Sequence, residues 1–188
     1  FADRIQHHCF GTGVLSPTAA SELWTLRAEI LDRALRAESA RWGDHRRDIN
    51  PSSQGHQSSD FDLYTVENTT RPVSDYLVES YFPVRRDVIV QQLRNDNLYP
   101  SVDAPVLTPG SGPISTGVVI SNPNPTGSII YTTDGSDPIN STTALTYSAP
   151  VNLTASGPVR VRILDRAEWS ALVEAIYIVG PPAADGNL

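Results

Sequence analysis

The sequence predicts an α+β protein in two parts, an N-terminal helical segment followed by a C-terminal all-β sandwich. Helical periodicity and acid–base pairs dominate the first half, whereas beyond Asp103 Pro and Gly punctuate short runs with a period of two. Charged residues also thin out there. We therefore expect a helical domain at 1–103, a β domain at 104–180, with a boundary near Ala104, and a linker to a further module at 181–188.

The longest predicted helix lies between Ser16 and Trp42. Ser16 can cap a helix, and Pro17 suits the first helical position because its missing N–H would have no partner there. Apolar residues recur on one stripe, which predicts a buried face made of Trp24, Ala28, Leu31, Leu35 and Trp42.

The flanking segments are less regular. The stretch 1–10 is typical of a helix end stopped at 11–13, where glycine tolerates positive φ. The stretch 43–71 is rich in polar residues and predicts a long surface loop. Helical periodicity returns after Pro72, so we expect two short helices interrupted at Pro83.

The second half contains the strand signals. Val159, Val161 and Ile163 alternate with arginines, and a second alternating run extends from Trp169 to Tyr177. A third run, 129–133, leads into Asp134-Gly135, a pair favoured where a tight turn needs positive φ. About seven short strands divided by turns predict a sandwich.

Two groups of residues resemble known families. FADRIQHHCFGTGVLSPTAA, AESARWGDHR and YFPVRRDVIVQQLRNDNLYP running into APVL resemble the C-terminal end of bacterial CotH kinase-like proteins. IIYTTDGSDP, TYSAPVNLTASGPVRVRI and EWSALVEAIYIV resemble the chitobiase/β-hexosaminidase C-terminal domain. The second resemblance implies an immunoglobulin-like accessory sandwich at the cell surface, with a further module after it.

No catalytic residue follows from either resemblance. An atypical kinase needs a nucleotide-binding lysine, metal-binding aspartates and a catalytic aspartate, yet all 14 basic residues are Arg and the matched part lies beyond such motifs. The accessory module implies no glycosidase activity, and no Gly-x-Ser-x-Gly nucleophile motif is present. We therefore expect this chain not to be an enzyme.

Composition restricts the partners. The net charge of −7 argues against nucleic acid, because phosphate binding needs clustered positive charge. No apolar run approaches the ~20 residues that cross a bilayer. The chain lacks Met, so we interpret Phe1 as an internal residue of a longer protein. The expected partners are neighbouring domains of that protein and possible polysaccharide.

Five side chains are candidates for ligand contact. Trp169, Tyr131 and Tyr147 could stack on sugar rings, although core or edge packing is the favoured interpretation. Asp134 and Asp137 could supply oxygens to calcium, although a plain turn needs the same residues. No cofactor other than this possible calcium is expected.

These observations predict a non-catalytic fragment of a secreted or cell-surface bacterial protein, acting as a spacer or accessory module with possible weak carbohydrate binding. The alternative is a fragment of the helical lobe of a CotH-type kinase that is inactive alone.

Overall fold

The computed structural model describes residues 1–49 and 64–180. The chain forms two compact units. One is discontinuous and combines Phe1–Phe10 with Val90–Leu188, and the other is Gly11–Ile89. The predicted linker at 181–188 lies outside the described residues.

Helix α2 (Pro17–Ile49) is the longest element of the Gly11–Ile89 unit. Its predicted start is confirmed, because the backbone amide of Ala19 donates to Ser16 Oγ at 3.3 Å. The helix continues well past Trp42, and a π-helical turn, η1, begins at Val66. The predicted loop at 43–71 is therefore too long at both ends, while its centre, 50–63, lies outside the described residues.

The close approach of another chain segment explains why glycine, a residue that normally weakens helices, occupies position 43 of α2. A Cβ at this position would lie 2.9 Å from the carbonyl oxygen of Tyr64, a distance that real side chains do not tolerate. Glycine thus lets the returning chain approach the helix closely, at a propensity cost of about 1 kcal/mol relative to alanine.

The return path is helical throughout. The turn η1 (Val66–Thr70) leads into α3 (Arg71–Tyr76), a second π-helical turn η2 (Leu77–Tyr81) and α4 (Phe82–Asn95). The two predicted short helices correspond to α3 and α4, and the α-helical pattern is interrupted before Pro83 by η2, although Phe82 keeps right-handed helical dihedrals. The π turn just before the proline changes the hydrogen-bond spacing where a residue without an N–H must be accommodated.

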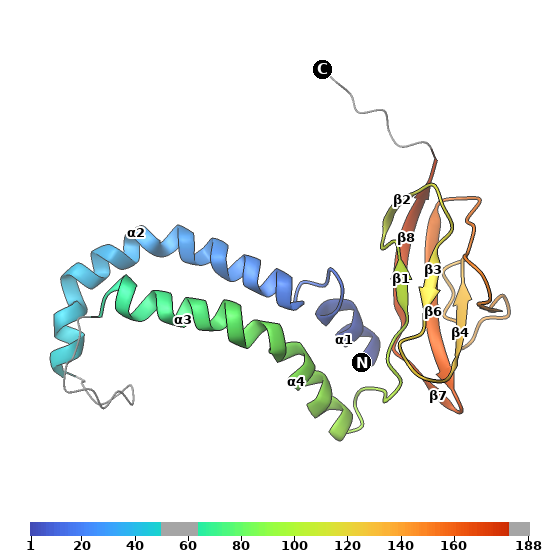
Figure 1. Ribbon diagram of the computed structural model, residues 1–188, viewed down its shortest axis with the longest axis horizontal. Helices are drawn as coiled ribbons and strands as arrows, with labels where there is room; N and C mark the ends of the chain where they lie inside the picture. The colour runs from blue at the N-terminus through green and yellow to red at the C-terminus, as the bar shows by residue number, and fades with distance from the viewer. Residues whose placement is uncertain (50–63, 181–188) are drawn as a thin grey trace, which may run out of the picture. The chain divides into compact units, whose positions relative to one another are not determined.

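Helix α2 lies alongside α3 (Figure 1), but its predicted buried face is only partly covered. Trp24 donates through Nε1 to Ser74 Oγ at 2.9 Å. Its ring meets that of Phe82 with a centroid separation of 6.4 Å. In contrast, Leu31 and Trp42 are 50% and 46% exposed, so the prediction that both are buried is wrong.

The β part of the other unit contains two sheets. The smaller pairs β1 (Val106–Thr108) with β3 (Val119–Ser121) in antiparallel fashion. The larger has the order β2-β8-β6-β4-β5, with β7 paired to β6. Its strands are β2 (Gly112–Ile114), β4 (Ser128–Thr132), β5 (Leu145–Thr146), β6 (Gly157–Asp165), β7 (Glu168–Trp169) and β8 (Val173–Val179).

One apolar cluster joins the two sheets. Ile120 from β3, Val159 and Val161 from β6, and Tyr177 from β8 are all buried in it. The alternation at 159, 161 and 163 therefore marks the inner face of β6, as predicted. The predicted fold class, α+β with helices before a sandwich, is confirmed.

Helix α1 (Ala2–Cys9) packs within the same compact unit as the sheets. A second cluster contains the buried residues Val90, Tyr99 and Ala171, with Ile5 and Phe10 packed against them. The change from helix to strand falls near the predicted Ala104. The compact unit, however, resumes earlier, at Val90, and so includes the C-terminal part of α4. The assignment of two domains at that boundary stays a prediction.

Candidate binding site

Tyr131 and Tyr147 are brought together, but against the sandwich core. Their ring centroids are 6.4 Å apart at an interplanar angle of 78°, and both rings pack on the apolar cluster between the sheets. The hydroxyl of Tyr147 accepts a hydrogen bond of 3.1 Å from the backbone amide of Ile120. Tyr147 thereby connects the small sheet to the segment before β6.

Trp169 lies elsewhere on the sheet. It is opposite Leu164 on β6, whereas Tyr131 is opposite Val161 on the other edge of the same strand. Residues 161 and 164 have opposite parity along a strand, so these neighbours project from opposite faces of the sheet. The three aromatic residues therefore do not form one sugar-stacking surface.

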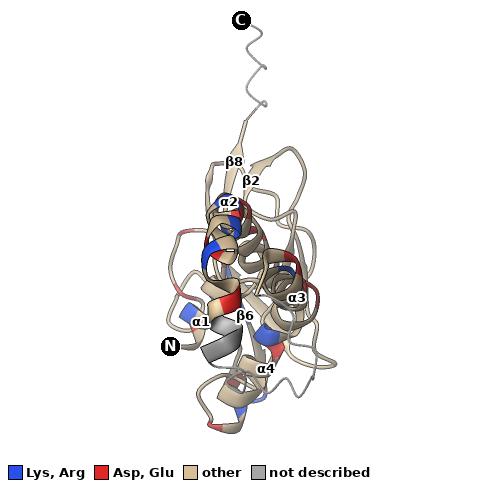
Figure 2. Cartoon of the chain, turned by 90° about the vertical axis from the view of Figure 1, so that its left-hand side faces the viewer, with Lys and Arg blue, Asp and Glu red and all other residues tan. Residues whose placement is uncertain are grey.

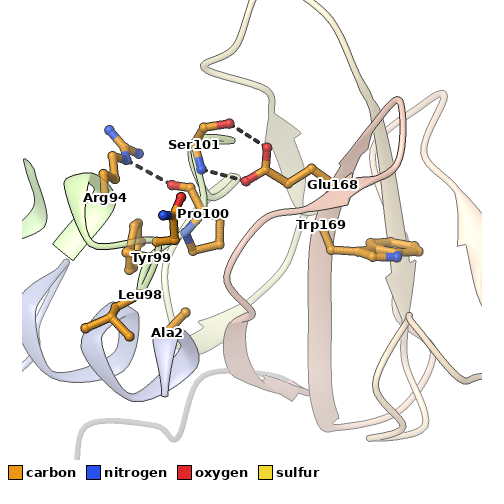
Figure 3. A pocket seen from close by; sticks show the side chains of 9 residues that line it. Ala2, Arg94, Leu98, Tyr99, Pro100, Ser101, Glu168 and Trp169 are labelled. Atoms are coloured by element: carbon orange, nitrogen blue, oxygen red, sulfur yellow. Dashed lines mark hydrogen bonds between the residues drawn. The ribbon is translucent and has the colours of Figure 1, made fainter.

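An open groove of about 520 Å³ lies next to Trp169. Its lining comprises Ala2, Arg94, Asn97, Leu98, Tyr99, Pro100, Ser101, Glu168 and Trp169. Figure 3 shows the indole of Trp169 directed away from the other labelled side chains.

The polar groups of this groove are largely engaged with one another. The carboxylate of Glu168 accepts from both the amide, at 2.7 Å, and the hydroxyl of Ser101. Arg94 donates to the carbonyl of Pro100 at 2.9 Å and pairs with Asp103. Burial raises the pKa of Tyr99 to about 12. Because these polar groups bond to one another, the groove offers few free groups to a ligand.

Asp134 organises the turn after β4. Its carboxylate accepts from the amide of Ser136 at 2.9 Å and from the hydroxyl of Thr143 at 2.6 Å. Donation by the Ser136 hydroxyl, followed by that of Thr143, lowers the pKa of Asp134 to about 2. Gly135 has the positive φ, 82°, that the Asp-Gly pair predicts.

Asp137 lies in the same turn but has another partner. Its two oxygens accept from Arg162 Nε at 2.8 Å and Nη2 at 2.7 Å, and Oδ1 also accepts from the amide of Ile139 at 3.1 Å. Donation by Arg162 holds the pKa of Asp137 below its usual range. Within 1–49 and 64–180, no group of three acidic, His or Cys side chains is arranged to hold a metal ion.

Arg162 is a buried polar residue whose role was not predicted from the sequence. Alternation with apolar residues along a strand is typical of a solvent-facing position, yet the side chain of Arg162 is only 6% exposed. A buried guanidinium needs acceptors for its five N–H donors, and here each nitrogen donates to a protein oxygen. No local pattern could indicate this, because the acceptors come from distant parts of the chain.

These features define a small β-sandwich module whose polar side chains mainly stabilise the module itself. Residues 118–177, which span β3 to most of β8, match the protein family described as Fn3 associated. A search of curated proteins found no match. The fold and the family match together indicate an accessory-type sandwich module.

Two further observations bear on partners. Among the described residues, no helix has the length and apolar composition needed to cross a bilayer. Basic and acidic residues are interspersed along the helices in the view of Figure 2.

Proposed function

We propose that this chain is a non-catalytic part of a larger secreted or cell-surface bacterial protein, in which the sandwich acts as a spacer or accessory module. The resemblance of the helical segments to CotH kinase-like proteins and of the strands to the chitobiase C-terminal domain supports this placement. The match of residues 118–177 to the Fn3 associated family supports the accessory role.

Three candidate site residues form hydrogen bonds within the module itself, and this observation supports the spacer role most directly. Tyr147 bonds a backbone amide, Asp134 closes a turn, and Asp137 pairs with Arg162. Among the described residues, no buried side-chain nitrogen or oxygen lacks a hydrogen-bond partner. Side chains engaged in this way favour a rigid spacer, since free polar groups are what a ligand site offers.

A second proposed role is weak carbohydrate binding through Trp169. Trp169 keeps a partly exposed indole on the sheet, and an aromatic face is the usual contact for the apolar side of a pyranose. Tyr131 and Tyr147 do not share this surface, so a sugar would contact Trp169 alone. A single stacking residue predicts an affinity in the millimolar range.

Affinity electrophoresis of the whole chain through soluble chitin- and cellulose-type polysaccharides distinguishes a spacer from a carbohydrate-binding module. A spacer migrates unchanged in every gel. If the chain is retarded and Trp169→Ala abolishes the retardation, the sandwich is a binding module and the spacer proposal is contradicted. Trp42→Ala is the matched control, because Trp42 is a partly exposed indole in the helical unit.

The alternative is that the helices complete the helical lobe of a CotH-type kinase. Leu23, Leu26 and Ile30 on α2 are 55%, 52% and 60% exposed, as expected for helices that pack against a further lobe. This alternative also predicts no activity for the chain alone. Transfer of labelled phosphate from ATP by the purified chain would contradict both proposals.

A further inference from the structure

Asp3 of helix α1 makes a two-pronged contact with Arg162. The guanidinium donates from Nη1 to Asp3 Oδ1 at 2.9 Å and from Nη2 to Oδ2 at 2.7 Å. The backbone amide of Leu172 donates to Oδ1 at 2.7 Å. Three donors from the sheet region thus converge on one carboxylate, which is a strong and directional arrangement.

Residues of the sandwich also hold these donors in place. Asp137 holds the guanidinium through Nε and Nη2, and the carbonyl of Ser170 accepts from Nη1 at 2.9 Å. Ser170 is itself fixed, because its hydroxyl accepts from the amide of Ile163 and donates to the carbonyl of Ala171. The segment that presents the Leu172 amide is therefore tied to β6.

An apolar surface continues from these donors. Ile5 of α1 and Phe10, which follows α1, pack on the cluster of Val90, Tyr99 and Ala171, and the Phe10 ring stacks on Tyr99 with a centroid separation of 6.3 Å. The Tyr99 hydroxyl donates to Gln6 Oε1. The surface thus receives an amphipathic helix with an acidic residue in its first turn, a recurring mode of peptide recognition.

We propose that Arg162 and the Leu172 amide form a carboxylate-binding site on the sandwich, and that α1 occupies it as an intramolecular ligand through Asp3. The ligand class is a short helix with a first-turn carboxylate and apolar residues on one face. The site uses a residue inside the family match, Arg162, and a ligand far outside it. It does not depend on the proposed spacer function.

Electrostatics agree with an occupied site. Burial alone would raise the pKa of Asp3, but donation by Arg162 and by the Leu172 amide outweighs it and keeps the pKa below its usual range. Arg162 faces two carboxylates, those of Asp3 and Asp137, so removal of Asp3 leaves the guanidinium with one anionic partner. A vacated site of this kind should accept a free carboxylate.

The test uses variants of the whole chain at Asp3, because loss of Arg162 would also remove the guanidinium partner of Asp137. Amide hydrogen exchange is followed at Leu172 and along α1. Asp3→Asn, which keeps the side-chain size but removes the charge, is expected to speed exchange at these amides about tenfold or more. Asp87→Asn, which breaks an exposed pair with Arg86, is the matched control and should leave them unchanged.

Chemical rescue separates a binding site from an ordinary structural ion pair. In Asp3→Ala, sodium acetate at about 100 mM should slow exchange of the Leu172 amide about tenfold, the effect of a ligand whose Kd is ten times lower than its concentration. Sodium chloride at equal ionic strength should not. The proposal is overturned if α1 exchange in Asp3→Asn stays within twofold of wild type, or if acetate acts no better than chloride.

Discussion

Substitution of Arg162 by lysine tests how strongly the sandwich depends on a guanidinium at this position. Lysine keeps the charge but has three N–H donors on one atom, whereas arginine places five in a planar fork. At least two of the hydrogen bonds to Asp3, Asp137 and Ser170 must therefore be lost. Both carboxylate side chains are partly exposed, 45% and 35%, so water recovers part of each interaction.

With about 1 kcal/mol for each lost bond after this discount, we expect Arg162→Lys to lower the free energy of unfolding of the β part by about 2 kcal/mol. The assay is amide exchange at Val161, a fully buried residue of β6. An energy of 2 kcal/mol corresponds to exchange about 30-fold faster. This probe reports the sandwich separately from the helical unit, whose unfolding need not coincide with it.

Arg160→Lys is the matched control on the same strand. Arg160 pairs with Glu174 and donates to the carbonyl of Gly135, but its side chain is 33% exposed. We expect an increase in exchange below about fivefold, equivalent to less than about 1 kcal/mol. Equal effects of the two substitutions, or an effect of Arg162→Lys below fivefold, would refute the reasoning.

Three further outcomes are expected. Gly127→Ala should lower the free energy of unfolding by about 2 kcal/mol in urea denaturation, because φ is 101° and a Cβ would lie 2.9 Å from a β6 side chain. Tyr147→Phe should cost about 1–2 kcal/mol in the same assay, since a β3 amide loses its acceptor. The Asp134 carboxyl should titrate near pH 2 by carbon NMR, so its contribution is present above about pH 4 and lost as pH falls toward 2.

Each of these has a comparison in the same chain. Gly110→Ala adds a Cβ with no heavy atom within 4 Å and should be near neutral, so an equal loss would contradict the account of Gly127. Tyr131→Phe removes a hydroxyl that makes no hydrogen bond to the described residues, so it should cost less than Tyr147→Phe. Thr143→Val removes a 2.6 Å donor and should raise the pKa of Asp134; an unchanged midpoint would show that the turn does not depend on it.

Local signals in the sequence predicted much of the fold. The alternation at Val159, Val161 and Ile163 marks a strand whose inner face is buried, and Asp134-Gly135 forms the expected turn. These signals suffice because side-chain alternation and positive φ are properties of a few adjacent residues. The end of α2 was missed because glycine normally favours a loop, whereas Gly43 lies within the helix where the distant backbone of Tyr64 leaves no room for a Cβ.

The chemistry around Arg162 could not be predicted for a related reason. Its partners Asp3 and Asp137 lie 159 and 25 positions away, so only the folded topology brings them together. The aromatic candidates show the converse. Tyr131 and Tyr147 are close in sequence and in space, and both pack against the core, as favoured from the sequence. Residue type alone could not distinguish this position from a sugar-binding face.

The compact unit that contains the sandwich is discontinuous in sequence, because the segment Gly11–Ile89 lies between its two parts. Val90, which follows this segment, is buried in an apolar cluster, and Phe10, which precedes the segment, packs against the same cluster. Because both flanking residues pack at one cluster, the length of the segment between them can change at small entropic cost to the unit that carries it.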